Sequence, residues 1–282
     1  MRDRAAQERR ARVIRGCIVA VALLCMLASV AEGQSRRDGF GHHASVFGED
    51  WGHVLSAPVH FNGNDWLLAG IAVVATASSW MVDEDVREWS QAHRDPQRDD
   101  WLLIGDYYGT GEVSTGVALL LYAGGEAFDD TWSRTTGRMV FQSMVYSEVF
   151  THVMKAVIGR SRPYADRGNA DFHPFTLAHE RTSFPSGHST AAFALATTLS
   201  RRIGHPAATV LLFTLAGVTV LQRIVSDSHW LSDTVLGAAI GTSTAWAVTE
   251  LENRREREAE QIPPGRQSTP RHAPLLHARI SF

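Results

Sequence analysis

The sequence contains very little lysine or cysteine and carries almost no net charge. Lys155 is the only lysine among 27 lysine and arginine residues, and the two cysteines, Cys17 and Cys25, lie in an apolar segment near the N-terminus. If that segment is removed, the remaining chain has no cysteine from which to build a disulfide framework. The net charge of −3 over 282 residues gives no reason to expect a polyanion such as nucleic acid as a partner.

Charge-free apolar stretches long enough to span a membrane are also scarce. A membrane-spanning helix needs about 20 apolar residues, and most of the stretches here are shorter: 66–82, 113–125, 188–200, 203–222 and 234–249. The mean hydropathy of −0.12 is low for a protein with six spans. These features favour an exported bundle that is periplasmic or membrane-associated over an integral membrane protein, which stays open as the alternative.

The N-terminus has the order of a secretory signal. A region rich in arginine precedes an apolar run from about residue 17 to residue 31, and small residues follow. This order predicts a signal peptide over residues 1–31 that directs export and is cleaved after Ala31 or Gly33. An uncleaved anchor is the alternative.

The rest of the sequence predicts an all-α protein with one catalytic domain. An apolar content of 44% is enough for one sizeable core, and long segments rich in Ala, Leu and Gly without sustained alternation favour helices. We predict an N-terminal arm over 32–64, a helical domain over 65–250 and a polar tail over 251–282. The six helices expected in the domain cover 65–82, 101–123, 138–158, 188–203, 206–223 and 230–250.

Three short blocks carry residues suited to phosphate chemistry. They are Lys155 to Arg162-Pro163, then Pro185-Ser186-Gly187-His188, and finally Arg223, His229 and Asp233 at the spacing R-x5-H-x3-D. All the other cationic residues of this sequence are arginines, so the single lysine at this position indicates a need for a compact ammonium group. Phosphoryl transfer requires several cations around one anion, and Lys155, Arg162 and Arg223 can supply them.

The same blocks supply candidates for an anion cradle and for acid/base chemistry. Ser186 and Gly187 follow a proline and begin an apolar stretch, so their N–H groups are predicted to lie at a helix N-terminus, where anions bind. His229 and Asp233 are four residues apart, so on a helix the carboxylate can orient the ring while its other nitrogen attacks phosphorus. His188 then remains to protonate the leaving alcohol and to activate water.

The three blocks resemble the signature of the type 2 phosphatidic acid phosphatase (PAP2) family. The wider superfamily includes bacterial class A acid phosphatases and vanadium-dependent haloperoxidases. The resemblance covers residues 155–233 in the order of the family's motifs. It implies a helical bundle of the PAP2/haloperoxidase type, a phosphohistidine intermediate at His229 and no metal or other cofactor. Gln222 departs from the pattern, because the family often has serine there, which puts one phosphate-side hydrogen bond in question.

An up-and-down bundle would bring these blocks to one pole. The third helix ends, the fourth begins, the fifth ends and the sixth begins on the same side. If all six helices crossed a membrane after a cleaved signal, that pole would face the cytoplasm, whereas the integral lipid phosphatases of the family are expected to act on the outer face. The number of crossings is therefore a second reason to expect that not every helix spans the membrane.

Polar residues near the blocks have ordinary structural interpretations. Arg160 is predicted to lie at a solvated helix end. Glu148 and His152 share a helix face with Lys155 and are expected to form a buried polar network, because two ligands are too few for a metal site.

Two connections are expected at the same pole. The charged connection over 83–100 is interpreted as a solvated loop, with the alternative that its acidic groups pair with the cations of the site. The connection over 164–184 is long for a compact domain and is a candidate lid. Its histidines, His173 and His179, are expected to be exposed.

We therefore predict a phosphatase that hydrolyses a lipid or isoprenoid phosphate monoester or pyrophosphate. Its expected partners are that substrate and a membrane surface, while composition does not determine the oligomeric state. One alternative is a vanadium-dependent haloperoxidase holding vanadate on His229, against which the short chain argues. The other is a module that binds a phosphate or lipid head group without turnover, which would not need the acid/base residues.

Overall fold

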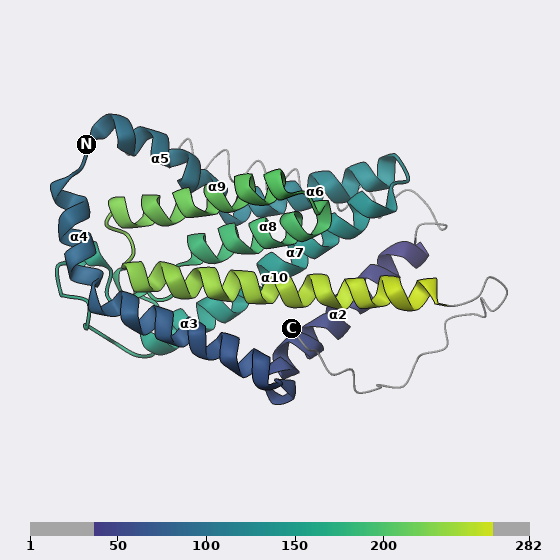
Figure 1. The fold of residues 1–282 in the computed structure, drawn as a ribbon, viewed down its shortest axis with the longest axis horizontal. Coiled ribbons are helices and arrows are strands. Elements are labelled where there is room, and N and C mark those ends of the chain that lie inside the picture. The colour runs from purple at the N-terminus through teal and green to yellow at the C-terminus, as the bar shows by residue number, and fades with distance from the viewer. Residues whose placement is uncertain (1–36, 262–282) are drawn as a thin grey trace.

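The structure is a computed structural model that describes residues 37–261, and every regular element in that part of the chain is helical (Figure 1). The predicted signal peptide and residues 262–282 of the predicted tail lie outside the described residues. The α-helices are α2 (Arg37–Ser56), α3 (Gly63–Met81), α4 (Asp83–Ala92), α5 (Pro96–Tyr108), α6 (Gly111–Ala127), α7 (Thr131–Ile158), α8 (Gly187–Ile203), α9 (Pro206–Val225) and α10 (Leu231–Glu260). Short 3-10 turns are η1 (Ala57–His60), η2 (Pro163–Ala165) and η3 (His179–Arg181).

α8 is the central helix of the bundle. It packs against α7, α9 and α10, while α6 lies on α7, α5 on α9 and α3 on α10. The buried apolar side chains of α8 are mostly alanines, and a Cβ atom on Gly241 of α10 would lie only 2.2 Å from the Thr190 carbonyl oxygen. Close approach of the two backbones, rather than interlocking of large side chains, therefore joins α8 to α10.

The predicted bundle with its motif residues at one pole is confirmed, with differences in its elements. The segment expected over 101–123 is two helices, because the Thr110 side chain accepts a hydrogen bond from the Val113 N–H (3.3 Å) and begins α6. The solvated loop expected over 83–100 is wrong, since α4 occupies residues 83–92. α2 lies within the arm expected over 32–64, and α10 continues past the predicted end at 250.

α2 joins the bundle through buried polar contacts at the pole far from the motif residues. The Asp50 carboxylate accepts hydrogen bonds from Gln142 of α7 (3.0 Å) and Arg255 of α10 (3.2 Å). Next to it, Arg138 of α7 and Glu252 of α10 form an ion pair with 2.6 Å between Nη2 and Oε2. The first residues of the predicted polar tail thus belong to the packed bundle.

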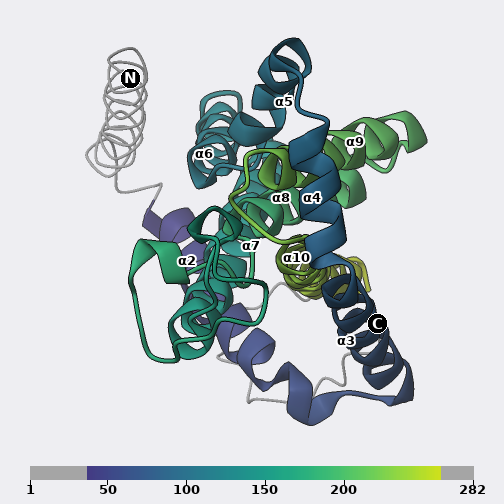
Figure 2. The ribbon, with the colours of Figure 1, turned by 90° about the vertical axis from the view of Figure 1, so that its left-hand side faces the viewer.

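The other pole collects the ends that carry the three blocks (Figure 2). α7 ends at Ile158 and is capped by Gly159, whose φ of 63° is left-handed. A Cβ atom added to Gly159 would lie 1.8 Å from the His173 carbonyl oxygen. The chain then passes through the connection over 164–184 and enters α8. α9 ends and α10 begins beside these elements, so the four helix ends predicted to meet do so.

Candidate active site

Three cations converge at this pole from different elements. Lys155 lies in the last turn of α7, Arg162 follows that helix, and Arg223 lies in the last turn of α9. Lys155 Nζ donates to the Thr182 carbonyl oxygen (2.7 Å), and Arg162 Nε donates to that of His179 (2.9 Å). Burial and the neighbouring Arg162 lower the pKa of Lys155 to about 8. Cations this crowded provide a place for a phosphate group.

His229 and Asp233 lie beside these cations at the start of α10. His229 Nδ1 is 3.5 Å from Asp233 Oδ2, and Nε2 is 3.4 Å from Arg162 Nη1. The Ser183 hydroxyl lies 3.5 Å from the same Nδ1 and donates to Asp233 Oδ2 at 2.5 Å. Burial, followed by the charge of Arg162, holds the pKa of His229 well below its ordinary value. The imidazole ring of His229 is therefore neutral, with Nδ1 facing the Asp233 carboxylate and Nε2 facing Arg162.

The second block forms the start of α8. The Ser186 N–H donates to the Asp233 carbonyl oxygen (2.9 Å), and the Ser186 hydroxyl accepts from the Ser189 N–H (3.4 Å). The N–H and the hydroxyl of Ser186 are therefore both engaged within the protein, and the N–H joins the start of α8 to that of α10. Gly187 and His188 hold the first two helical positions, where N–H groups have no acceptor inside the helix. Of the two residues predicted to form the cradle, the geometry favours Gly187.

Asp106 of α5 is a candidate that the sequence analysis missed. Its Oδ1 forms an ion pair with Arg223 and lies 3.4 Å from His188 Nε2. Burial and the charge of Arg223 hold the pKa of His188 well below its ordinary value. Gln222 accepts a hydrogen bond from Arg223 Nε (2.5 Å), so this departure from the family pattern orients the arginine. For Asp106, the only signal in the sequence is that the alternating directions of the helices place the start of the second predicted helix at this pole.

Arg160 is not at a solvated helix end, so that prediction is wrong. It is 1% exposed, and its Nη1 donates to Asp233 Oδ1 (2.6 Å) while Nη2 donates to Asp83 Oδ2 (2.8 Å). The reason is local: the left-handed turn at Gly159 directs the next residue inward, beneath the 164–184 connection.

Residues 138–257 match the family model described as the PAP2 superfamily. This segment is therefore similar to the PAP2 superfamily over somewhat less than half of the chain. A lipid A 1-phosphatase of Rhizobium etli is 34% identical over 113 residues, which are 37% of this chain and 45% of the relative. A lipid A 1-phosphatase of Porphyromonas gingivalis is 44% identical over 61 residues, which are 21% of this chain and 14% of the relative. The chain thus spans less than half the length of these curated relatives.

Among solved structures, a transmembrane PAP2-type phosphatidylglycerolphosphate phosphatase from Bacillus subtilis is similar in fold. Its TM-score is 0.54 at 19% identity, and the match covers 71% of this chain and 97% of that chain. The resemblance seen in the motif blocks is therefore confirmed at the level of family and fold. The segment that matches the PAP2 model contains every predicted site residue, but it contains neither Asp83 nor Asp106.

Two other features near the PAP2 blocks differ from expectation. His152 lies 3.3 Å from Glu148, but its side chain is 72% exposed, so the predicted buried network with Lys155 is wrong. α4 pairs with the loops of the site, because Arg87 contacts Asp227 (2.7 Å) and Asp166 (2.6 Å). Within residues 37–261 no group of three or more His, Cys, Asp or Glu side chains is suited to a metal ion.

Proposed function

We propose that the chain is a metal-independent phosphatase that transfers the phosphoryl group of a lipid or isoprenoid phosphate to His229 and then to water. The observation that carries this proposal is the placement of the His229 ring, with Asp233 near Nδ1 and Arg162 near Nε2. A module that only binds phosphate needs the cations but has no use for an oriented nucleophile.

In the first step, Lys155, Arg162 and Arg223 hold the phosphoryl oxygens. The lone pair of His229 Nε2 forms the P–N bond while the P–O ester bond breaks. His188 gives its proton to the leaving alkoxide, which departs as the alcohol. The low pKa of His229 keeps the attacking lone pair free at neutral pH.

In the second step, water attacks phosphorus and the P–N bond breaks. His188, now neutral, takes a proton from the water, and inorganic phosphate leaves with His229 restored. The low pKa of His188 in the free site arises partly from Arg223. A bound phosphate dianion opposes that effect, so substrate binding itself favours the protonated His188 that the first step requires.

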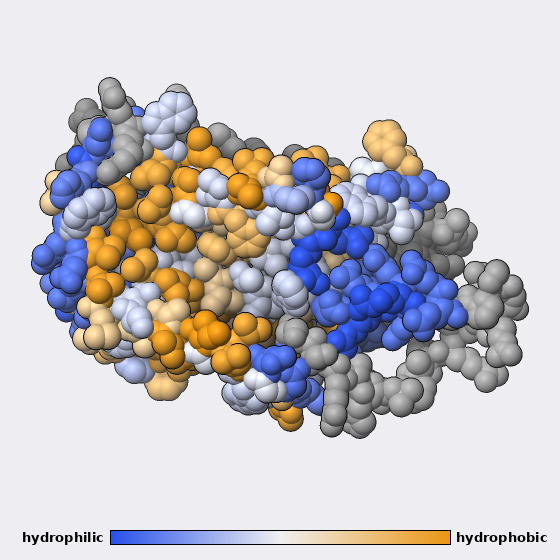
Figure 3. Space-filling model, in the orientation of Figure 1, coloured by the Kyte–Doolittle hydropathy of each residue, from blue (hydrophilic) through white to orange (hydrophobic). Residues whose placement is uncertain are grey.

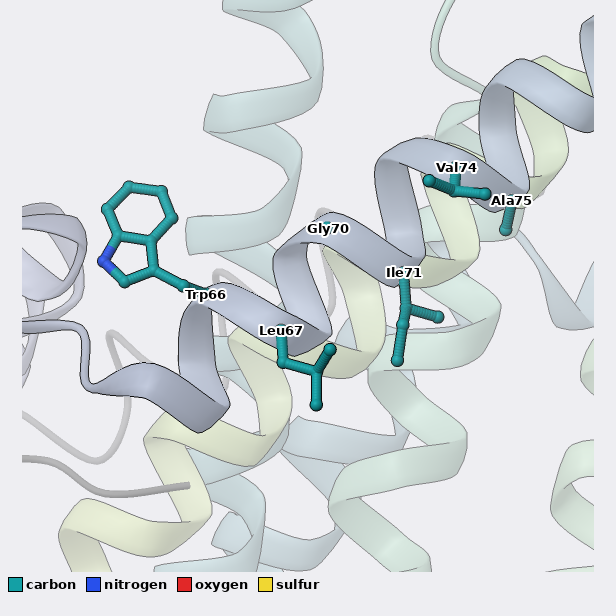
Figure 4. A pocket seen from close by; sticks show the side chains of 6 residues that line it. All are labelled: Trp66, Leu67, Gly70, Ile71, Val74 and Ala75. Carbon is teal, nitrogen blue, oxygen red and sulfur yellow. The ribbon is translucent and has the colours of Figure 1, made fainter.

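Relatives and surface character support a lipid as the substrate. The curated relatives are lipid A 1-phosphatases. Large apolar side chains are exposed over α3 and α9 (Figure 3), including Leu67, Val74 and Leu211. On α3 an open apolar groove of about 480 Å³ is lined by Trp66, Leu67, Gly70, Ile71, Val74 and Ala75 (Figure 4). Large exposed apolar surfaces of this kind are typical of membrane-interaction sites.

The same surface supports attachment of the exported protein to a membrane. In the described part of the chain, α9 is the only single helix that is long and apolar enough to cross a bilayer. Only 28% of its most apolar segment is buried within the protein. α3 and α4, bent by 55°, form a second candidate when taken as one broken span. A lipid phosphate would then reach the polar pole from the bilayer on which the protein lies.

The test is phosphate release by the full chain in detergent with EDTA present. The substrates are p-nitrophenyl phosphate, phosphatidic acid, lipid A and an isoprenyl pyrophosphate, and the matched variant is His229→Ala. We expect release that EDTA does not reduce and that the variant loses, with a ³²P label retained on His229 after acid-free quenching. Folded protein that releases nothing contradicts the proposal, and vanadate-dependent bromination would then identify a haloperoxidase.

A further inference from the structure

Asp83, at the start of α4, is buried against the first turn of α10. Its Oδ1 accepts a hydrogen bond from the Ser232 N–H (2.9 Å), and its Oδ2 accepts from the Ser232 hydroxyl (2.6 Å) and from Arg160 (2.8 Å). The residue is 1% exposed and lies at the bend between α3 and α4. A carboxylate this deeply buried is costly unless its partners are all retained. The contact therefore ties the bend to the start of α10.

Arg160 connects Asp83 to Asp233. Besides these two carboxylates, its guanidinium donates through Nε to the Asn169 carbonyl oxygen (2.8 Å) and through Nη1 to the Ser232 hydroxyl (2.8 Å). Four aromatic rings have centroids 5.1 to 5.9 Å from its guanidinium carbon. The planar fork is enclosed and occupied at all three nitrogens, so a single orientation satisfies its partners.

This arrangement determines which oxygen of Asp233 faces the nucleophile. Oδ1 is held by Arg160, whereas Oδ2 accepts from the Trp230 N–H (2.9 Å) and Ser183 and faces His229 Nδ1. The carboxylate cannot rotate without breaking these bonds. Catalytic hydrogen bonds are often long in a free enzyme and tighten with substrate, so the 3.5 Å separation from His229 fits a carboxylate already aimed at the ring.

We propose that Asp83 and Arg160 are positioning residues for the phosphatase reaction. They hold Asp233 in the orientation that aligns His229, and they couple the site to the bend between α3 and α4. The inference rests on the proposed function of the same site. Asp83, Arg160 and Asp233 together carry one negative charge, which balances the positive ring formed when His229 is phosphorylated. Neither positioning residue contacts the phosphate, so their loss acts on kcat and leaves phosphate binding to the three cations.

The kinetic test compares Arg160→Lys and Asp83→Asn with Glu252→Gln. Arg160→Lys keeps the positive charge but loses the planar guanidinium. Asp83→Asn replaces the carboxylate that accepts from Arg160 with a neutral amide, and so removes the charge of this contact. Glu252→Gln weakens a buried arginine pair of similar length at the opposite pole. We expect the first two to lower kcat 10- to 100-fold, with KM and the inhibition constant of inorganic phosphate changed less than threefold. Glu252→Gln lowers the unfolding temperature without lowering kcat. A matching loss of kcat in Glu252→Gln, or a loss confined to KM, overturns the proposal.

A second readout does not depend on turnover. In the ¹⁵N spectrum of histidine-labelled full chain, the His229 ring signals are assigned by their loss in His229→Ala. We expect Arg160→Lys and Asp83→Asn to shift these signals and Glu252→Gln to leave them in place. Unchanged His229 signals in Arg160→Lys and Asp83→Asn contradict the positioning role. Because the spectrum is informative even if the wild type releases no phosphate, failure of this inference is separable from failure of the proposed function. If Asp83→Asn does not fold, Arg160→Lys alone decides the outcome.

Discussion

Lys155 is the residue whose charge sets the upper pH limit of the proposed reaction. Its pKa is lowered to about 8 by burial and by Arg162, so the ammonium loses its proton at a lower pH than an ordinary lysine. We expect kcat/KM for p-nitrophenyl phosphate to fall as pH rises through about 8, because one phosphate contact loses its charge.

The matched variant for this prediction is Lys155→Arg. Arginine does not titrate in this range, so we expect a lower maximum without the fall near pH 8. The measurement is the pH profile of kcat/KM from about pH 5 to about pH 10, since that profile reports the ionisations of the free enzyme. An identical alkaline fall in wild type and variant would show that another group titrates there.

At the residue scale, the ion pair of Asp106 with Arg223 predicts that this carboxylate competes with phosphate for the guanidinium. Removing its charge in Asp106→Asn frees the guanidinium, so inorganic phosphate should inhibit about fivefold more strongly, as expected for a partly exposed ion pair worth about 1 kcal/mol. At the same time kcat should fall, because His188 loses a neighbouring carboxylate. The inhibition constant of phosphate measures the first effect.

The control for Asp106 lies on the same helix. Asp99 forms an ion pair with Arg94 (3.1 Å), and Arg94 is not a residue of the candidate site. Asp99→Asn should leave phosphate inhibition unchanged. Equal effects of the two substitutions would mean that net charge, rather than the contact with Arg223, controls inhibition.

At the scale of elements, the contact between α8 and α10 sets the geometry of the site, since the two helices begin with Ser186 and with the His229–Asp233 pair. Gly241→Ala would force a Cβ atom against the Thr190 carbonyl oxygen. We expect it to lower the free energy of unfolding by about 1–3 kcal/mol, measured by thermal unfolding followed by tryptophan fluorescence.

Gly217→Ala on α9 is the matched control for this contact. An added Cβ atom there meets nothing within 4 Å, and alanine favours a helix over glycine by about 1 kcal/mol. Stability should therefore be unchanged or slightly higher. A Gly241→Ala protein as stable as Gly217→Ala would show that the helices separate without cost.

The elements also show where pattern and structure diverge. α3, α7, α8, α9 and α10 follow from their apolar composition and length. α4 was missed because its first turn, with Asp83, Glu84 and Asp85, has the composition of a solvated loop. Burial of Asp83 depends on a partner 77 residues away, and no local pattern records that partner.

At the scale of the whole molecule, the apolar surface over α3 and α9 should bind the protein to lipid. We expect the full chain to float with phospholipid vesicles. Ile71→Asp places a charge among the exposed apolar residues of α3 and should reduce the floating fraction, because a charge in the bilayer costs about 3 kcal/mol.

The control adds the same charge to the same helix outside its apolar surface. Asn64 is an exposed polar residue in the first turn of α3, and Asn64→Asp should float like the wild type. Equal loss of flotation in both variants would indicate general repulsion by anionic lipid instead of contact through the apolar surface.

The sequence by itself was enough to predict the resemblance to the PAP2 family, the helical class and the candidate side chains of the three blocks. This was possible because the motif spacings are local: R-x5-H-x3-D and the single lysine can be read within a few helical turns. It also predicted that the blocks share one pole, because successive helices of an up-and-down bundle run in alternating directions.

Only the tertiary structure decided what surrounds those side chains. It buried Arg160 between Asp83 and Asp233, placed Asp106 beside Arg223 and left His152 exposed. Asp106 and Arg223 are 117 residues apart. Contacts over such separations follow from how whole helices pack and where each chain turn directs its next residue, and neither is encoded in the period or composition of a single segment.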